Sequence, residues 1–254
     1  MALAPIRCAV TLAVSFAPVA AHACQGAAFA WARIARAAQP WLARLVAAAL
    51  VGCMLAPRAW DAGTMLRAAQ AQGPQALDGA RALQAVLASL NGQDEAARLV
   101  AINQFFNRRV MFASDQEAWG QLDYWASPLE TLAKGRGDCE DYVIAKYFSL
   151  AVAGVPISRL RLVYVRATIG GPGGETLAHM VLAYYASAGA EPLILDNLIG
   201  EIRPASRRPD LEPVFSFNGE GLWQGVGAQS AGDPVARLSR WREVLAKARA
   251  EGFQ

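Results

Sequence analysis

Three side chains in the second half of the sequence have the types and order that nucleophilic catalysis requires. Cys139 follows a glycine-rich turn at residues 135–138 and is predicted to stand in the first turn of a helix. The partial positive charge of a helix N-terminus lowers the pKa of a thiol and favours the nucleophilic thiolate. His179 and Asp196 fall in two predicted neighbouring strands, which can bring their side chains together on one face. A thiol, a basic imidazole and a carboxylate that orients the imidazole form the arrangement of thiol acyl-transfer enzymes.

The rarity of cysteine and histidine strengthens this hypothesis. Cys139 and His179 are the only cysteine and the only histidine after residue 57, because Cys8, Cys24 and Cys53 all precede it. A lone thiol forms no internal disulfide, and in an oxidising compartment it is a liability that calls for a chemical role. A helical cysteine followed by a histidine and an aspartate on strands is also the papain-like order. The alternative is structural, since a lone cysteine is usually a small buried apolar residue and a lone histidine a hydrogen-bonded core residue.

Three acidic residues flank the thiol and suggest a second kind of chemistry. Asp138, Glu140 and Asp141 surround Cys139 in the sequence. Three carboxylates near a thiol oppose its ionisation, and a bound divalent cation would cancel their field. Carboxylate oxygens are the ligands that calcium prefers. The alternative needs no metal, because acidic residues at a helix start are favourable caps and dipole partners.

The residues before Cys139 are predicted to be mostly helical. Apolar residues recur at helical spacing within residues 61–113, as at Leu83 and Leu87, and Asp94 is predicted to cap the second of these helices. Residues 114–137 are rich in aromatic residues and are predicted to form a loop.

The period of the apolar pattern changes after a third helix, which is predicted to run from Cys139 to about Ala153. The predicted strands and a final amphipathic helix lie, in order, at residues 160–166, 177–185, 193–198 and 234–250. A glycine-rich turn at residues 169–176 joins the first two strands. Helices followed by an antiparallel sheet predict an α+β domain.

The first sixty residues differ in composition from the rest. They contain five arginines and no aspartate or glutamate. Two apolar stretches, residues 8–21 and 45–56, have the length of a signal-sequence core, and Leu50-Val51-Gly52-Cys53 also has the form of a lipoprotein box. We therefore predict that residues 1–57 are an export signal or N-terminal apolar region and that residues 58–254 form the folded domain. Anchoring of the exported protein by a lipid on Cys53 is an alternative to an unanchored periplasmic protein.

The composition excludes several classes of protein. The net charge of +3 comes from the acid-free N-terminal part, so it predicts no nucleic-acid partner for the folded domain. No apolar stretch reaches the roughly 20 residues of a membrane span without an arginine or proline, which excludes a multi-pass membrane protein. Only four cysteines are present, which excludes a disulfide-rich scaffold.

Several motifs in a fixed order resemble one known family. The run Gly137-Asp138-Cys139-Glu140-Asp141-Tyr142, followed by Ile144-Ala145-Lys146-Tyr147, closely resembles the bacterial transglutaminase-like cysteine proteinases, and within them the LapG-type periplasmic proteases. The resemblance covers about residues 60–250, and its further motifs are Asn107-Arg108-Arg109, Trp119-Gly120, Tyr124-Trp125-Ala126-Ser127-Pro128-Leu129-Glu130, Ala178-His179-Met180-Val181-Leu182-Ala183-Tyr184-Tyr185, Leu195-Asp196-Asn197 and Val214-Phe215-Ser216-Phe217-Asn218. The glycine-rich run at residues 170–174 is the one local departure, since we expect a shorter loop there.

The resemblance implies a fold and a site. It implies a papain-like or transglutaminase-like α+β fold, with a helical N-terminal part packed on an antiparallel sheet. The catalytic triad of the family falls on Cys139, His179 and Asp196. A calcium ion beside the nucleophile would be bound by Asp138 and Glu140, with Asp141 as a less firm ligand. The backbone N–H of Cys139 is the natural first donor of an oxyanion hole, and the second is expected from residues 119–125.

The resemblance also implies a biological role. It implies a calcium-dependent periplasmic cysteine endopeptidase that cleaves the N-terminal region of a large, repeat-rich biofilm adhesin near a pair of alanines and releases it from the cell surface. An inner-membrane receptor for cyclic di-GMP is the implied inhibitory partner. Two alternatives remain open: a transglutaminase or amidase on the same fold, in which the thioester acceptor differs, and a non-catalytic binding module, against which the intact Cys-His-Asp set argues.

Overall fold

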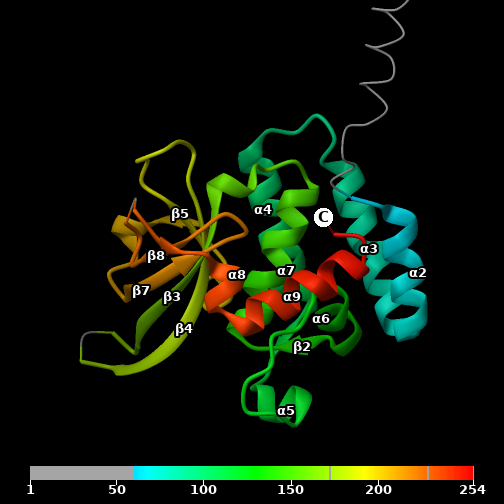
Figure 1. Cartoon of the computed structure of the whole chain (residues 1–254), viewed down its shortest axis with the longest axis horizontal. Coiled ribbons are helices and arrows are strands. Elements are labelled where there is room, and N and C mark those ends of the chain that lie inside the picture. Colours follow the sequence, from blue (N-terminus) through cyan, green and yellow to red (C-terminus); the bar gives the residue numbers. More distant parts are fainter. Residues whose placement is uncertain (1–59, 172, 228, 254) are drawn as a thin grey trace, which may run out of the picture. The chain divides into compact units, whose positions relative to one another are not determined.

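A computed structural model describes residues 60–171, 173–227 and 229–253 of the chain (Figure 1). The predicted export signal at residues 1–57 and the alternative of a lipidated Cys53 lie outside these residues. None of the described helices is long and apolar enough to cross a bilayer. The helices are α2 (Ala62–Gln72), α3 (Pro74–Ser89), α4 (Glu95–Arg109), α5 (Asp115–Trp119), α6 (Pro128–Lys134), α7 (Cys139–Val152), α8 (Pro234–Arg237) and α9 (Ser239–Ala250). The strands are β1 (Met111–Phe112), β2 (Arg136–Gly137), β3 (Leu160–Ile169), β4 (Glu175–Tyr184), β5 (Leu193–Leu195), β6 (Arg203–Pro204), β7 (Leu211–Phe217), β8 (Leu222–Gln224) and β9 (Ser230–Gly232).

The N-terminal helices form a packed layer because their ends and contact faces are encoded locally. Asp94 caps α4 by accepting a hydrogen bond from the Ala97 N–H at 2.8 Å, as the sequence predicts. Helix α3 packs against both α2 and α6. A Cβ atom at Gly79 would lie 2.8 Å from the Cβ of Leu132, so the close approach of α3 and α6 requires glycine at this position.

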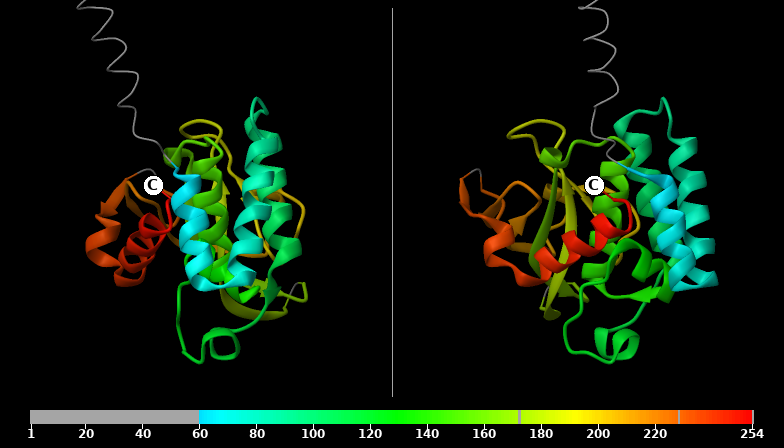
Figure 2. Two further views of the ribbon diagram at one scale, coloured as in Figure 1. Left: turned by 90° about the vertical axis from the view of Figure 1, so that its right-hand side faces the viewer. Right: turned by 45° about the vertical axis from the view of Figure 1, so that its right-hand side comes forward.

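Helix α7 joins the helical layer to the sheet. It contacts α4 and α6 on one side and strands β3 and β4 on the other (Figures 1 and 2). Residues 141–150 of this helix are all buried. A helix that is buried all round has no solvent-facing stripe, and even its polar residues Asp141 and Lys146 are buried. The contacts of α7 with helices on one side and strands on the other set the position of its first residue, Cys139.

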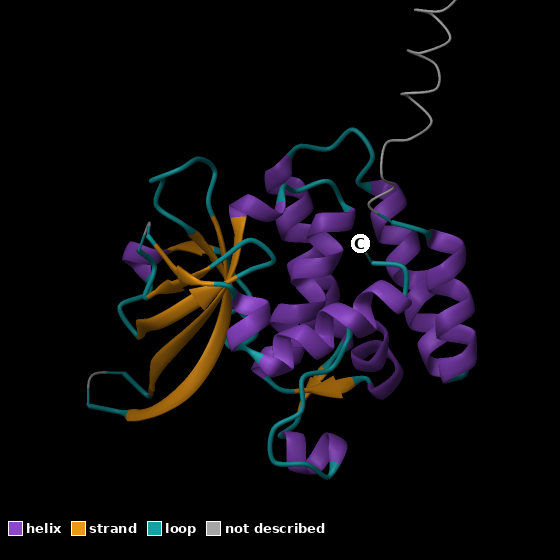
Figure 3. Ribbon diagram, in the orientation of Figure 1, coloured by secondary structure: helices purple, strands orange, loops and turns teal. Residues whose placement is uncertain are grey.

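The seven-stranded sheet is antiparallel throughout, in the order β6-β5-β4-β3-β7-β8-β9. Its strands are the orange arrows beside the helices in Figure 3. Strands β1 and β2 form a separate parallel pair. Strands β3 and β4 pair over their whole length, from Leu160 opposite Tyr184 to Ile169 opposite Glu175. Alternate residues of the two strands face α7, as Leu162 does, and contribute to the main core. The residues between them build a smaller apolar cluster on the opposite face of the sheet.

The α+β architecture is confirmed, and three local predictions are corrected. Residues 114–137 are not a loop throughout, because they contain α5 and α6, each of which begins with a capping box of a serine and a glutamate three residues later. The predicted C-terminal helix is broken at Leu238 into α8 and α9. Strands β6 to β9 are additional, since a proline-punctuated sequence with strands of two to seven residues carries little periodic signal.

Candidate active site

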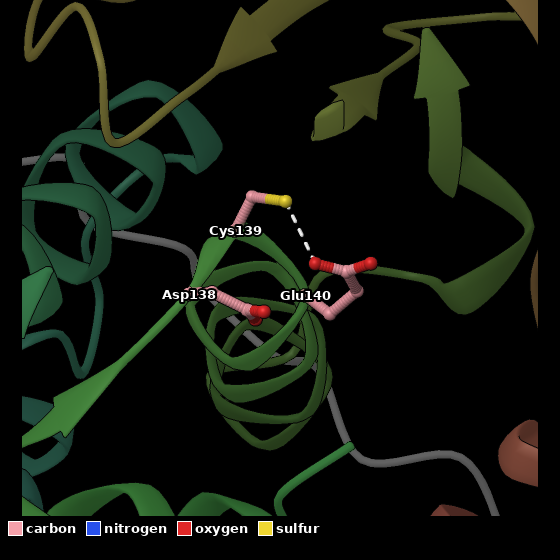
Figure 4. Close-up of side chains that lie close together, drawn as sticks. All are labelled: Asp138, Cys139 and Glu140. Carbon is pink, nitrogen blue, oxygen red and sulfur yellow. Dashed lines mark hydrogen bonds between the residues drawn. The ribbon is translucent and has the colours of Figure 1, made fainter. Parts of the chain in front are cut away.

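The candidate nucleophile stands at the first position of α7, with Asp138 as the N-cap residue. Strand β2 leads into this turn, and a Cβ atom at Gly137 would lie 2.4 Å from a carboxylate oxygen of Asp141. Glycine is therefore required for the Asp141 carboxylate to fold back against the turn. The Cys139 thiol is partly buried and donates a hydrogen bond to Glu140 Oε2 at 2.7 Å (Figure 4).

The thiol is held in its protonated form by its surroundings. Burial raises the pKa of Cys139, and the negative charges of Glu140 and Asp138 raise it further. The backbone N–H of Met180, which faces the sulfur, acts in the opposite direction. Burial and the two carboxylates thus act against the helix N-terminus, which favours the thiolate. The thiol therefore needs compensating positive charge to become nucleophilic near neutral pH.

The structure brings His179 and Asp196 together. His179 Nε2 lies 2.8 Å from Asp196 Oδ1, and both side chains are buried. Because the Asp196 carboxylate accepts this bond, Nε2 carries the proton and Nδ1 has the free lone pair of a base. The Met180 backbone faces the Cys139 sulfur and so places the thiol beside the strand that carries His179. Among the described residues, however, the thiol makes its hydrogen bond with Glu140 and not with the imidazole.

A buried arginine, which the sequence analysis did not identify, holds the candidate orienting carboxylate. Arg208 Nη2 donates to Asp196 Oδ2 at 2.8 Å, with side chains 1% and 0% exposed. The Leu198 N–H donates to the other oxygen at 3.1 Å. Burial raises the pKa of Asp196, but the hydrogen bonds from His179 and Arg208 outweigh it and lower the pKa to about 2. The carboxylate is therefore ionised at every pH at which the imidazole can act as a base.

Two further side chains fix the backbone of Asp196. Its carbonyl oxygen accepts hydrogen bonds from Asn107 Nδ2 at 2.8 Å and from Lys146 Nζ at 3.1 Å. Lys146 is fully buried, and burial lowers its pKa to about 7 against the opposing effect of the Asp196 charge. Asn107 lies on α4 and Lys146 on α7, so both neighbouring helices anchor the loop that follows β5. Both residues belong to the sequence motifs above, where neither had a role.

The acidic residues around the thiol form two overlapping groups whose oxygen or sulfur atoms lie within 4.8 Å of one another. One group is Asp138, Cys139 and Glu140, and the other is Asp115, Asp138 and Asp141. Asp138 therefore connects the two groups. The sequence analysis missed Asp115, because it lies in the first turn of α5, in residues that were predicted to be a loop. Its capping box is the local signal that could have placed it on a helix.

The hydrogen bonds of these carboxylates show which oxygens remain available. Asp141 accepts from the Ala126 N–H at 2.8 Å and from Trp119 Nε1 at 3.3 Å, so both of its oxygens have partners. Asp115 Oδ1 and Asp138 Oδ1 are buried and have no hydrogen-bond partner among the described residues. Burying an unpaired carboxylate oxygen is costly. The two orphaned oxygens, which belong to a cluster of hard donors, fit a cation such as calcium.

The charge state of the cluster supports the same interpretation. Burial raises the pKa of Asp138 to about 9, with Glu140 and Asp141 adding to the rise. Burial also raises the pKa of Asp141 to about 7. Crowded carboxylates of this kind either bind protons or require a positive ion between them.

These contacts exclude two N–H groups near the site as the second donor of the oxyanion hole. Trp119 Nε1 and the Ala126 N–H both donate to Asp141 and are therefore committed. The backbone N–H of Cys139 lies in the first turn of α7, where N–H groups have no partner within the helix. It can therefore point at a developing oxyanion.

Comparison with known proteins identifies the family of the chain. A family described as bacterial transglutaminase-like cysteine proteinase BTLCP matches residues 79–209, a range that contains Cys139, His179, Asp196 and Arg208. A solved structure of Legionella pneumophila LapG is similar with a TM-score of 0.63 and 35% identity, covering 74% of this chain and 97% of that one. The structure of an EGTA-treated form of the same protein is similar with a TM-score of 0.65 and 36% identity, covering 74% of this chain and 97% of that one. The structure of a calcium-bound form is similar with a TM-score of 0.64 and 35% identity, covering 74% of this chain and 98% of that one. No curated protein matches the chain.

Proposed function

The chain belongs to the family of bacterial transglutaminase-like cysteine proteinases, and from that premise we propose that it is a calcium-dependent cysteine endopeptidase with Cys139 as nucleophile. One observation carries the proposal. The buried imidazole of His179, hydrogen-bonded to Asp196, lies on strand β4, and the next residue of that strand, Met180, directs its backbone at the Cys139 thiol. A non-catalytic binding module has no need for a buried, charge-supported imidazole of this kind.

The chemistry follows from the positions of the hydrogen-bonding groups. His179 Nδ1 takes the thiol proton, and the Cys139 sulfur attacks the carbonyl carbon of the scissile peptide bond. The resulting oxyanion is stabilised by the Cys139 N–H. The tetrahedral adduct collapses to a thioester when the imidazolium donates its proton to the leaving amine. His179 then removes a proton from water, which hydrolyses the thioester and regenerates the thiol.

Asp196 and Arg208 keep the imidazole ready for both proton transfers. Asp196 fixes Nε2 as the protonated nitrogen, so that Nδ1 always faces the reaction as the base. The buried positive charge of Arg208 keeps the Asp196 carboxylate ionised. Asp196 therefore stabilises the imidazolium without taking its proton.

Calcium dependence is supported by the acidic cluster and by LapG, of which calcium-bound and EGTA-treated structures are similar to this chain. Asp138 and Glu140 would hold the ion, with Asp115 and Asp141 completing the carboxylate set. When bound, calcium supplies positive charge that lowers the pKa of neighbouring acids and thiols. Without that charge, Glu140 accepts a hydrogen bond from the thiol, and Cys139 stays protonated and neutral.

The biological setting is proposed from the family resemblance. We propose that the enzyme acts in the periplasm on the N-terminal region of a large, repeat-rich surface adhesin and cleaves it near a pair of alanines, which releases the adhesin. We also propose that an inner-membrane receptor for cyclic di-GMP inhibits it by sequestration. Both statements rest on the resemblance of the sequence motifs to the LapG-type periplasmic proteases.

The test is incubation of the protein with an adhesin N-terminal fragment that contains an Ala-Ala pair, in calcium and in excess chelator. We expect a new amino terminus at the Ala-Ala pair with wild type, and none with Cys139→Ala, which should unfold at the same temperature. A primary amine added to the reaction distinguishes hydrolysis from transglutamination. Incorporation of the amine without chain cleavage would contradict the endopeptidase proposal.

A further inference from the structure

Strand β4 has an open edge that runs past the candidate catalytic histidine. On one side β4 pairs with β3 from Glu175 to Tyr184. On the other side β5 pairs only with residues 182–184. Among the described residues, no strand pairs with residues 175–181 of β4 on this second side. Figure 3 shows the β3–β4 hairpin extending well beyond the short strand β5.

Part of this edge is accessible to solvent. Residues 175–178 are exposed, whereas residues 179–184 are buried. The change occurs at His179, so the accessible segment immediately precedes the imidazole in the chain. We call residues 175–178 the open segment of β4. Natural sheets usually protect such an edge, because its free N–H and C=O groups pair readily with another extended chain.

The hydrogen-bonding direction of the open segment is fixed by its neighbours. The Tyr185 N–H donates to Arg159 O at 2.8 Å, on the β3 side of the strand. Because successive residues of an antiparallel strand direct their backbone groups to opposite sides, the odd-numbered residues of β4 face β3. The even-numbered residues Thr176, Ala178 and Met180 therefore face the open edge. The Met180 N–H facing the Cys139 sulfur agrees with this direction.

We infer that a flank of the substrate polypeptide binds as an added, extended strand along residues 175–178 of β4, hydrogen-bonded to the backbone of Thr176 and Ala178. The inference rests on the proposed function and names how its substrate is held. The occupant is an extended peptide because the edge offers a row of backbone donors and acceptors. We assign the substrate as this peptide because the row of backbone groups continues through Met180 to the Cys139 thiol, which must attack the substrate.

This binding mode has a consequence for sequence preference. Backbone groups of the substrate at alternate positions would pair with β4, whereas those between them would point away. Recognition would therefore tolerate many side chains but not a proline at a paired position, since proline has no N–H to donate.

The test is a scan of N-methylated peptides based on the Ala-Ala adhesin sequence, with kcat/KM measured for each. We expect losses of about tenfold at alternate positions on one flank of the cleaved bond, each corresponding to one lost hydrogen bond. Methylation at the intervening positions of the same flank is the matched control and should change kcat/KM by less than about twofold. Equal losses at adjacent positions, or no loss on either flank, would overturn the inference.

A second experiment tests the same inference with variants of the enzyme. Thr176→Pro removes the N–H that faces the open edge without touching the ladder to β3, and it lies away from the catalytic groups. We expect it to raise KM about tenfold, while Thr168→Ala, at the position of β3 that pairs with Thr176, leaves KM unchanged. An unchanged alkylation rate of Cys139 would show that the catalytic centre is intact. If Thr176→Pro leaves KM unchanged or alters only the oligomeric state, then the edge does not bind substrate.

The two proposals fail in different ways. If the unmethylated peptide and the adhesin fragment are not cleaved, then the proposed endopeptidase function is wrong and this inference falls with it. If both are cleaved and no alternation is found, then the function stands and only the binding mode is refuted.

Discussion

Replacing Arg208 by glutamine should impair catalysis without direct contact with the substrate. Arg208 donates to Asp196 Oδ2 at 2.8 Å in a pair whose side chains are 1% and 0% exposed. A hydrogen bond between charged groups contributes about 1.5–3 kcal/mol, and each 1.4 kcal/mol corresponds to about a tenfold change in rate. If this support acts on the imidazolium of the transition state, then kcat/KM should fall roughly 10- to 100-fold, with little change in KM.

The same substitution should reduce stability in a pH-dependent way. Removing one partner of a buried ion pair costs about 3–5 kcal/mol, because the remaining charge is left uncompensated. The pKa of Asp196 is lowered to about 2 in the native state, so its contribution to stability is fully present above the unfolded value of about 3.9. That contribution is lost as the pH falls towards 2. The difference in free energy of unfolding between wild type and Arg208→Gln should therefore be largest near pH 7 and shrink below pH 4.

The assay is a pH profile of kcat/KM together with urea unfolding at several pH values. Arg208→Lys keeps the charge and should recover part of the activity. Arg166→Gln is the matched control, because it breaks an ion pair with Glu212 whose side chains are 59% and 65% exposed, and such pairs contribute little. A folded Arg208→Gln protein with wild-type kcat/KM at every pH would refute the role given to this residue.

Three further outcomes are expected. His179→Ala should abolish cleavage as completely as Cys139→Ala, and the double variant should lose no more than either single one, because the two residues act as a unit; additive losses would argue against one shared site. In metal-free protein, Glu140→Gln should lower the pKa of Cys139, whose thiol now donates to that carboxylate, and should therefore speed alkylation of Cys139 at neutral pH; an unchanged rate would show that Glu140 does not restrain the thiol. Gly79→Ala should lower the free energy of unfolding by about 1–2 kcal/mol, because its Cβ would lie 2.8 Å from Leu132 Cβ, and a urea midpoint equal to that of wild type would contradict this.

The residues that carry local signals could be predicted from the sequence. Cys139 at the start of α7 follows a glycine-containing turn, and His179 and Asp196 lie on or beside strands with a period of two. The N-cap residue of α4, Asp94, could likewise be predicted from the sequence. In each case the chemistry depends on a position within one helix or strand, which periodicity and capping residues define.

Contacts between distant segments could not be predicted in this way. Arg208 reaches Asp196 from the turn that follows β6, and no spacing rule connects the two positions. Asp115 joins Asp138 and Asp141 only because α5 folds back beside the start of α7. In the sequence, Lys146 is one residue of a predicted helix. Only the folded structure shows that it is buried and donates to the Asp196 carbonyl oxygen.

The central claim is that Cys139 cleaves a peptide bond and that calcium controls its ionisation. The most direct measurement follows, in one sample, the rate of cleavage of an Ala-Ala adhesin fragment and the rate of alkylation of Cys139 as free calcium is varied. Both rates should rise together with the same half-saturation, and magnesium should substitute poorly, since it demands a tighter octahedral site. Cleavage that persists in excess chelator, with an alkylation rate that does not change, would contradict the account.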